Sequence, residues 1–280
     1  MAAGTLTACG AGGGVTYAGG TFDEAAPGTT ASAASADEKR GRELAVRGME
    51  LLRTADTVRM GIDMSTPKGH QKVTLHMDRD SNCTGTFDAG PSQRGELIMV
   101  AGDATYVRFS DASLDAIREM GELRSPEAAA TVRERTALAR GKYLKIPAGA
   151  AGAPSVPGMK CDLDELTGKL TGGPDADDVI RALPETRRYG TRVTPLVETA
   201  GGAHKDTNEA PAASESTETT VYVAASGEPY ILGFEGTDEG GRSMRMRMSA
   251  YDEPVAAKAP AADLTLDIAR IRGGGGLFEV

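Results

Sequence analysis

Few groups of side chains in this chain have both the residue types and the spacing that a reaction needs. The segment Ser65-Thr66-Pro67-Lys68 matches Ser-x-x-Lys, in which a lysine activates a serine nucleophile at the start of a helix. Here the four residues contain a proline, precede Gly69 and separate two segments of alternating apolar residues, which is typical of a hairpin turn. The partner motifs Ser-Asp-Asn and Lys-Thr-Gly do not occur in the chain. We therefore expect a turn and no acyl-transfer site.

A second group resembles the opening of a calcium-binding loop. Asp162, Asp164 and Glu165 supply carboxylates at the start of such a loop. The sixth position, however, is Thr167, where the loop needs Gly. The twelfth position is Gly173 where the loop needs a bidentate Glu. The pattern therefore does not predict a calcium site.

The remaining candidates for chemistry are the histidines and a glycine run. The histidines occur in an expected turn, an expected strand and an expected loop, with no spacing that would bring two of them onto one metal ion: His70, His76 and His204. Gly273–Gly276 is not followed by the Lys-Ser/Thr of a phosphate-binding loop. No set of nucleophile, base and orienting group is visible. We expect no enzyme activity, no metal and no cofactor.

The three cysteines suggest two different roles. Cys9 ends the segment Leu6-Thr7-Ala8-Cys9, which has the form of a bacterial lipobox and predicts a diacylglycerol attached to the Cys9 sulfur. A secretory signal also needs a basic start and an apolar stretch, and Met1–Thr5 supplies neither. Either the natural start lies upstream, or Cys9 is an ordinary cysteine in a tail. The first alternative is the one we expect.

Cys83 and Cys161 are the other two cysteines, one on an expected strand and one at the head of an expected helix. In an exported protein, such a pair is typical of a disulfide. The alternative is two buried free thiols, since reduced cysteine packs as a small apolar residue. We expect the disulfide.

Composition restricts the partners further. The 280 residues carry a formal net charge of -9 and no Lys/Arg cluster is visible along the sequence, which argues against nucleic-acid binding. No run of about 18 apolar residues is present, so any membrane attachment would be covalent or peripheral. Aromatic residues are only 4% of the chain whereas there are 11 methionines, so apolar surfaces here are made by flexible aliphatic and thioether side chains.

The order of the expected elements indicates one antiparallel α+β domain. Residues 9–36 are rich in Gly, Ala, Thr and Ser and predict a flexible tether, and Ser35-Ala36-Asp37-Glu38 is a capping box that starts a helix. The expected strands are residues 57–64, 72–78, 83–87, 96–101, 105–109, 188–197, 217–224, 230–236 and 242–251. Helices are expected within 111–140, from 161 to 170 and over 176–183, so the strand groups would be two halves of one sheet separated by a helical insertion.

These features resemble a known group of lipoproteins. The segments that carry the resemblance are Leu6-Thr7-Ala8-Cys9, Asn82-Cys83-Thr84-Gly85, Gly141-Lys142-Tyr143-Leu144-Lys145 and Cys161-Asp162-Leu163. The chain looks like an actinobacterial lipoprotein of the Streptomyces type, and over residues 39–260 it resembles the LppX/LprG family and, more distantly, the LolA and LolB carriers. The resemblance implies a strongly curved antiparallel half-barrel, with helices packed on its concave face around a cavity for lipid chains.

The expected organisation follows from these observations. Residues 1–8 would be the remnant of a signal and lipobox, 9–36 the tether, 37–262 the single LppX/LolA-like domain and 263–280 a C-terminal tail. The protein would be extracytoplasmic, held at the outer face of the cell membrane through the lipid on Cys9. Its partner would be a lipid or another apolar small molecule.

The alternating segments supply the candidate ligand-binding face. Its residues are Met60, Ile62, Met64, Val73, Leu75, Met77, Val221, Val223, Met244, Met246 and Met248. Two functions are compatible with such a face. It could line a cavity that binds lipid, as a carrier needs, or it could be the filled core of a non-transporting surface lipoprotein that acts as a sensor or assembly partner.

Overall fold

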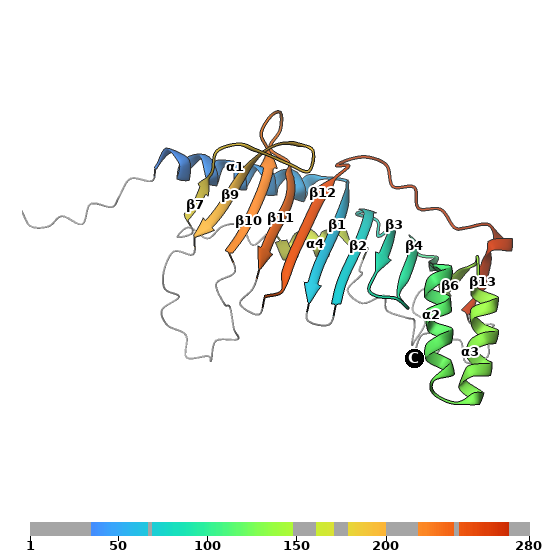
Figure 1. The fold of residues 1–280 in the computed structure, drawn as a ribbon. Coiled ribbons are helices and arrows are strands. Elements are labelled where there is room, and N and C mark those ends of the chain that lie inside the picture. Colours follow the sequence, from blue (N-terminus) through green and yellow to red (C-terminus); the bar gives the residue numbers. More distant parts are fainter. Residues whose placement is uncertain are drawn as a thin grey trace, which may run out of the picture. The chain divides into compact units, whose positions relative to one another are not determined.

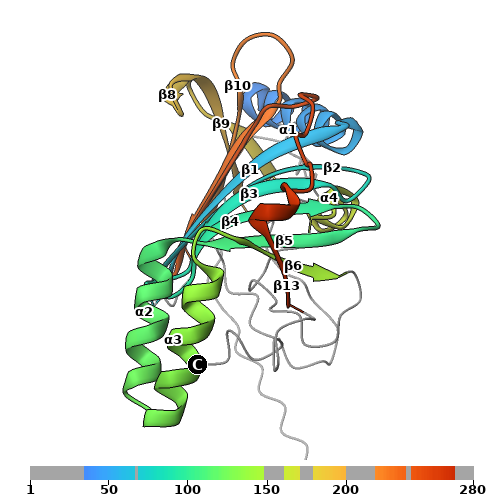
Figure 2. The same ribbon diagram turned by 90° about the vertical axis from the view of Figure 1, so that its right-hand side faces the viewer.

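Thirteen strands form one open sheet in the part of the chain that the computed structural model describes (Figure 1). The described residues are 35–66, 69–147, 161–170, 179–199, 218–237 and 241–268. The strand order is β13-β6-β5-β4-β3-β2-β1-β12-β11-β10-β9-β7, and β8 pairs with β9 beside this path. The sheet is curved and does not close on itself (Figure 2). This is the α+β class that the sequence predicts.

The first part of the chain contains α1 (Ala36–Thr54), β1 (Thr57–Thr66), β2 (Gly69–Asp78), β3 (Cys83–Asp88), β4 (Arg94–Val100), β5 (Ala104–Phe109), α2 (Asp111–Glu122), α3 (Pro126–Ala139) and β6 (Tyr143–Pro147). The second part contains α4 (Leu163–Leu170), β7 (Val179–Ala182), β8 (Thr186–Arg188), β9 (Thr191–Thr199), β10 (Glu218–Ala224), β11 (Ile231–Thr237), β12 (Ser243–Ser249), a 3-10 turn (Ala262–Leu264) and β13 (Thr265–Asp267). Cys9 lies outside the described residues.

Strand β1 joins the two strand groups into one sheet. It pairs with β2 through the predicted hairpin and, on its other side, with β12 near the end of the chain. The alternation of apolar residues in both strands explains this pairing, because a strand that is apolar on one face must lie beside strands whose apolar residues face the same side. The expectation that the two groups are halves of one sheet is confirmed.

The structure departs from the expected elements in two places. The described sheet is mixed and not purely antiparallel, because β13 runs parallel to β6 at the edge, in a stretch expected to be tail. Residues 179–182 form strand β7 where a helix was expected. Ile180 and Ala182 face the core while the residue between them is exposed, and β9 supplies the backbone partners, so tertiary pairing overrides the local helical pattern.

Helix α1 begins at the predicted capping box and packs on the sheet through two glycines. The Ser35 hydroxyl accepts from the Glu38 backbone N–H at 3.2 Å, and a Glu38 carboxylate oxygen accepts from the Ser35 N–H at 2.8 Å. Gly41 and Gly48 lie seven residues apart on one side of α1 and are buried. A Cβ at Gly48 would meet the Pro229 carbonyl oxygen at 2.9 Å, so α1 closely approaches the backbone of the turn between β10 and β11.

Substituting Gly41 tests this close approach. A Cβ at Gly41 would overlap the carbonyl oxygen of Ile180 on β7, so Gly41→Ala should lower the free energy of unfolding by about 1–3 kcal/mol, despite the better helix propensity of alanine. Gly168→Ala is the matched control, because Gly168 is an exposed position inside α4 with no atom near its Cβ direction. It should raise stability by about 0.5–1 kcal/mol. Urea denaturation measures both, and a stabilising effect at Gly41 would contradict the packing.

The other helices are attached to different parts of the sheet. Figures 1 and 2 place α4 on the same face of the sheet as α1. Helices α2 and α3 pack against each other, and α2 contacts β4, where the Arg94 backbone N–H donates to the Ser113 hydroxyl at 2.9 Å. The helical spacing places Leu114, Ile117 and Met120 on one face of α2; Leu114 and Ile117 are buried, whereas Met120 is 37% exposed. No helix among the described residues is long and apolar enough to cross a bilayer.

Candidate ligand-binding face

The residues predicted to form an apolar face are brought together on the side of the sheet that carries α1 and α4. In the strand register, Met60 lies between Leu75 and Met248. In the next row, Ile62 lies between Val73 and Met246. Further along, Met64 pairs with Met244, and Val221 is opposite Phe234, which is opposite Met246. Met77 and Val223 belong to the same apolar cluster.

This apolar face is divided into a covered part and an open part. The covered part consists of residues that are at most 6% exposed: Met60, Leu75, Met77, Val223, Met246 and Met248. The open part, which we name the open apolar end, consists of Ile62, Met64, Val73, Val221, Phe234 and Met244. These side chains are half-buried, except Met244, which is 44% exposed. Phe234 was not among the predicted residues, although the register places it in the row of Ile62 and Met246.

The covered part and the open apolar end differ in burial because the helices cover them to different extents. Leu52 of α1 and Leu163 of α4 are fully buried in the cluster that contains Met60, Met77 and Met248. Leucines at these positions exclude water from the neighbouring strand residues. The described helices do not shield the open apolar end to the same extent, since its side chains remain in part accessible. The face therefore has a packed core at one end and accessible apolar surface at the other.

A disulfide fixes the start of α4 to the sheet. Cys83 on β3 and Cys161 are joined, with their Cα atoms 5.8 Å apart, and both residues are buried. The predicted bridge is confirmed. Because Cys161 comes two residues before α4, the bridge holds this helix near β3.

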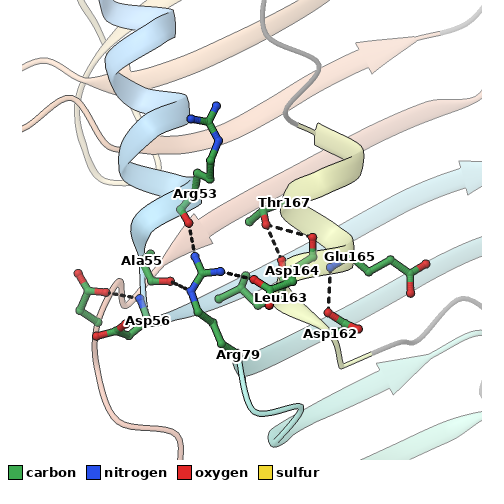
Figure 3. Close-up of polar contacts among 10 residues, drawn as sticks. Arg53, Ala55, Asp56, Arg79, Asp162, Leu163, Asp164, Glu165 and Thr167 are labelled. Atoms are coloured by element: carbon green, nitrogen blue, oxygen red, sulfur yellow. Dashed lines mark hydrogen bonds and ion pairs between the residues drawn. The ribbon is translucent and has the colours of Figure 1, made fainter.

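Arg79 makes a second connection between α4 and its neighbours (Figure 3). Its guanidinium donates to the backbone carbonyl oxygen of Ala55 at 2.9 Å and to that of Arg53, at the end of α1. It also forms an ion pair with Asp164 of α4. A guanidinium at the C-terminal end of a helix satisfies carbonyl groups that have no partner within the helix. Arg79 therefore connects α1 and α4 to the turn between β2 and β3.

The acidic group that resembled a calcium loop has a structural role here. The Asp162 carboxylate accepts from the Glu165 backbone N–H at 2.8 Å at the start of α4, and Asp164 pairs with Arg79 (Figure 3). Within the described residues, no three or more His, Cys, Asp or Glu side chains gather as a metal site requires.

The opposite face of the sheet is polar and contains a pocket of about 450 Å³. We name it the outer pocket; its charged and aromatic lining residues are Arg59, Asp63, Lys72, Tyr189, Arg245 and Arg247. These residues occupy the alternate positions of β1, β2 and β12, together with the turn between β8 and β9. The sequence alternation places Arg245 and Arg247 opposite the methionine face. It does not show that they meet Arg59 and Lys72, because this depends on the pairing of β1 with β12.

Glu235 organises the polar face beside the outer pocket. Its carboxylate accepts from the Tyr189 and Tyr222 hydroxyls at 3.1 and 3.2 Å, and it pairs with Arg188 at 2.5 Å and Arg245 at 3.1 Å. Burial alone would raise the pKa of Glu235, but the hydrogen bonds from Arg188 and Tyr189 outweigh it and hold this pKa below its ordinary value. Burial and the adjacent Glu235 raise the pKa of Tyr189. Tyr189 therefore stays neutral and donates to a charged carboxylate.

No protein-family model matches this sequence, and no curated protein matches it. Several solved structures are similar at low sequence identity. Lipoprotein LppX from Mycobacterium tuberculosis is 10% identical, with 79% of this chain and 100% of that chain covered and a TM-score of 0.45. LprF from Mycobacterium bovis is also 10% identical, with 81% and 100% covered and a TM-score of 0.48. A LolA-superfamily protein from Nitrosomonas europaea is 9% identical, with 81% and 97% covered and a TM-score of 0.26. The similar solved structures thus include two mycobacterial proteins, one of them named a lipoprotein, and a LolA-superfamily protein.

Proposed function

We propose that this protein is a cell-envelope lipoprotein that binds a lipid or another apolar ligand at the open apolar end, as a carrier does. The observation that carries the proposal is the accessibility of Ile62, Val73, Val221 and Phe234, which are half-buried and lie on both sides of the buried Met246 in one row beside the packed core. Covering apolar surface releases about 25 cal/mol for each Å², so a contiguous apolar surface favours an apolar occupant.

The side chains at the open apolar end suit cargo of varied shape. Met64 and Met244 form a cross-strand pair there, and methionine has a flexible, polarisable chain that adapts to different partners. A core that specifies a single packing normally uses branched or aromatic residues in preference to methionine. Residue type alone does not separate the two uses, because Met60, Met77 and Met248 lie in the packed core; the accessibility of Met64 and Met244 does.

Location and attachment complete the proposal. The disulfide between Cys83 and Cys161 supports an extracytoplasmic location, because such bonds persist in oxidising compartments. The lipid on Cys9 and the tether over residues 9–36 would hold the domain at the outer face of the membrane, within reach of lipid. Intact-mass analysis of membrane-extracted protein checks the attachment, and an unmodified Cys9 would contradict it.

The non-transporting alternative is favoured by one observation. Six of the predicted face residues are nearly inaccessible, so much of the face is core in this structure: Met60, Leu75, Met77, Val223, Met246 and Met248. A sensor or assembly partner needs only a stable packed core and no ligand cavity. The two functions differ in whether the open apolar end holds lipid.

The deciding experiment measures lipid bound per mole of folded protein. Protein purified without detergent is extracted with organic solvent and the extract is analysed by mass spectrometry, and a fluorescent fatty acid is titrated into delipidated protein. Val73→Asp and Val221→Asp should each reduce bound lipid and probe affinity at least about tenfold, because a carboxylate must lose its hydration against the acyl chain.

Val46→Asp is the matched control, since Val46 is 53% exposed on α1 and the chemical change is the same. This variant should bind lipid and probe as the unchanged protein does. Wild-type protein that yields no lipid and does not bind the fatty acid would favour the non-transporting function. Equal losses of bound lipid in Val73→Asp, Val221→Asp and Val46→Asp would show that lipid does not bind at the open apolar end.

A further inference from the structure

The outer pocket lies on the face of the sheet opposite the open apolar end and has a basic lining. Four cationic side chains, Arg59, Lys72, Arg245 and Arg247, face a single carboxylate, Asp63. The register explains why they meet: Asp63 is directly opposite both Lys72 and Arg245, and Gly61 is directly opposite Arg247. In a protein with a formal net charge of -9, this concentration of positive charge is a local departure from the average.

Three of these cations have no acidic partner among the described residues. Arg245 pairs with Glu235 at 3.1 Å, and Asp63 contacts the Nε2 atom of His70 at 3.2 Å. By contrast, Arg59 contacts the Nδ1 atom of His76 at 3.5 Å, and Arg247 lies over the Tyr189 ring at 5.7 Å. Lys72 lies between Asp63 and Asp88 in the strand register and forms an ion pair with neither of them in the described part of the chain. Arg59, Lys72 and Arg247 are therefore available to an anion.

The floor of the outer pocket is open because Gly61 has no side chain. A Cβ at Gly61 would meet only the Thr74 hydroxyl, at 3.9 Å, so the glycine is not required for packing. Glycine inside a strand weakens the strand and often marks a position that a ligand approaches closely. Arg247 lies opposite this gap and Arg59 lies two residues along β1, about 7 Å away along the strand.

The wall of the outer pocket is held rigidly. Tyr189 has a φ of 53°, and its hydroxyl donates to Glu235. A Cβ at Gly233 would meet the Tyr189 hydroxyl oxygen at 2.6 Å, so this glycine makes room for the ring. Tyr222 packs edge-on against Tyr189, with ring centroids 5.8 Å apart. The ring therefore offers a fixed surface on which the Arg247 guanidinium stacks, which reduces the entropy that Arg247 loses when it binds an anion.

We propose that the outer pocket binds a phosphoryl group through Arg59, Arg247 and Lys72. Guanidinium groups bind phosphate oxygens in a bidentate manner, and lysine adds a compact positive charge. A phosphate monoester offers three terminal oxygens to converging cations, whereas a carboxylate offers two, which one guanidinium satisfies. The phosphoryl group could belong to a soluble compound or to a phospholipid headgroup, and both present the same chemistry to the pocket.

The test is a calorimetric titration of inorganic phosphate at low ionic strength into the full chain. Arg59→Gln and Arg247→Gln should each weaken phosphate binding at least tenfold. Arg118→Gln removes the same charge from α2, far from β1 and β12 in the sequence, and should change affinity less than twofold. Gly61→Val keeps every charge and fills the floor, so it should also weaken binding tenfold while circular dichroism shows an unchanged fold.

The remaining arms identify the source of the phosphoryl group. Vesicles of phosphatidylcholine with phosphatidic acid are compared with vesicles of phosphatidylcholine alone. If the protein is retained on the vesicles with phosphatidic acid and Arg247→Gln abolishes this retention, the phosphoryl group belongs to a lipid headgroup. If the protein binds phosphate but is not retained on these vesicles, the phosphoryl group belongs to a soluble compound. Absence of saturable phosphate binding, equal losses in Arg118→Gln and Arg247→Gln, or tighter binding of polyglutamate than of phosphate would overturn the proposal. Lipid extracted from the open apolar end is measured in the same variants and should not change, so the two proposals can fail separately.

Discussion

Removing the disulfide by Cys83→Ala with Cys161→Ala should lower the free energy of unfolding by about 4–5 kcal/mol. The bridge spans a sequence separation of 78 residues, and a cross-link over so long a segment removes much of the conformational freedom of the unfolded chain. Both cysteines are buried and each alanine lacks one sulfur atom, so a small cavity adds to the loss that comes from the missing cross-link. Equilibrium urea unfolding measures the change.

Reductant supplies the control for this prediction. Adding dithiothreitol during unfolding should lower the stability of the unchanged protein toward that of the double variant and leave the double variant unaffected. A loss below about 1 kcal/mol would mean that Arg79 and the packing of Leu163 hold α4 without the bridge. This outcome would contradict the role given to the disulfide.

Two methionines on the same strand should respond very differently to truncation. Met248→Ala should cost about 2–5 kcal/mol of unfolding free energy, because Met248 is 1% exposed and its loss leaves a cavity in the packed core. Met244→Ala should stay within about 0.5 kcal/mol, because Met244 is 44% exposed. Both residues face the same side of β12, so strand position and residue type are matched.

Chemical denaturation of the two variants measures this difference directly. Similar losses at Met244 and Met248 would show that the open apolar end is packed as tightly as the core, which would favour the non-transporting function. The fatty-acid titration adds a second readout. Met244→Ala should weaken probe binding with little loss of stability, whereas the probe affinity of folded Met248→Ala should change less.

Local features of the fold could be predicted from the sequence because their causes are local. The capping box at Ser35 depends on two residues three positions apart. The alternation through Met60, Ile62 and Met64 depends on the period of a strand, in which successive side chains face opposite sides. The pairing of Cys83 with Cys161 needed only the number of cysteines and the expectation of export.

The pairing of strands that are distant in the sequence, and the covering of the apolar face by helices, could not be predicted in the same way. Residues 179–182 became a strand because β9 offered an unpaired edge, and the local sequence contains no sign of this partner. Which apolar residues are core and which are accessible depends on where α1 and α4 lie, so Met248 and Met244 are indistinguishable by pattern and differ only in the folded protein.

The residue types on each face of the strands follow from the amino-acid sequence alone, because alternation assigns every side chain to one side or the other. Which residues of these faces become neighbours depends on the pairing of the strands in the folded protein. Pairing of β1 with β12 places Arg247 opposite Gly61 and Met248 opposite Met60, across residues that are far apart along the chain. Backbone hydrogen bonds between strands do not depend on side-chain identity, so the partner of each strand is selected by packing of the whole sheet.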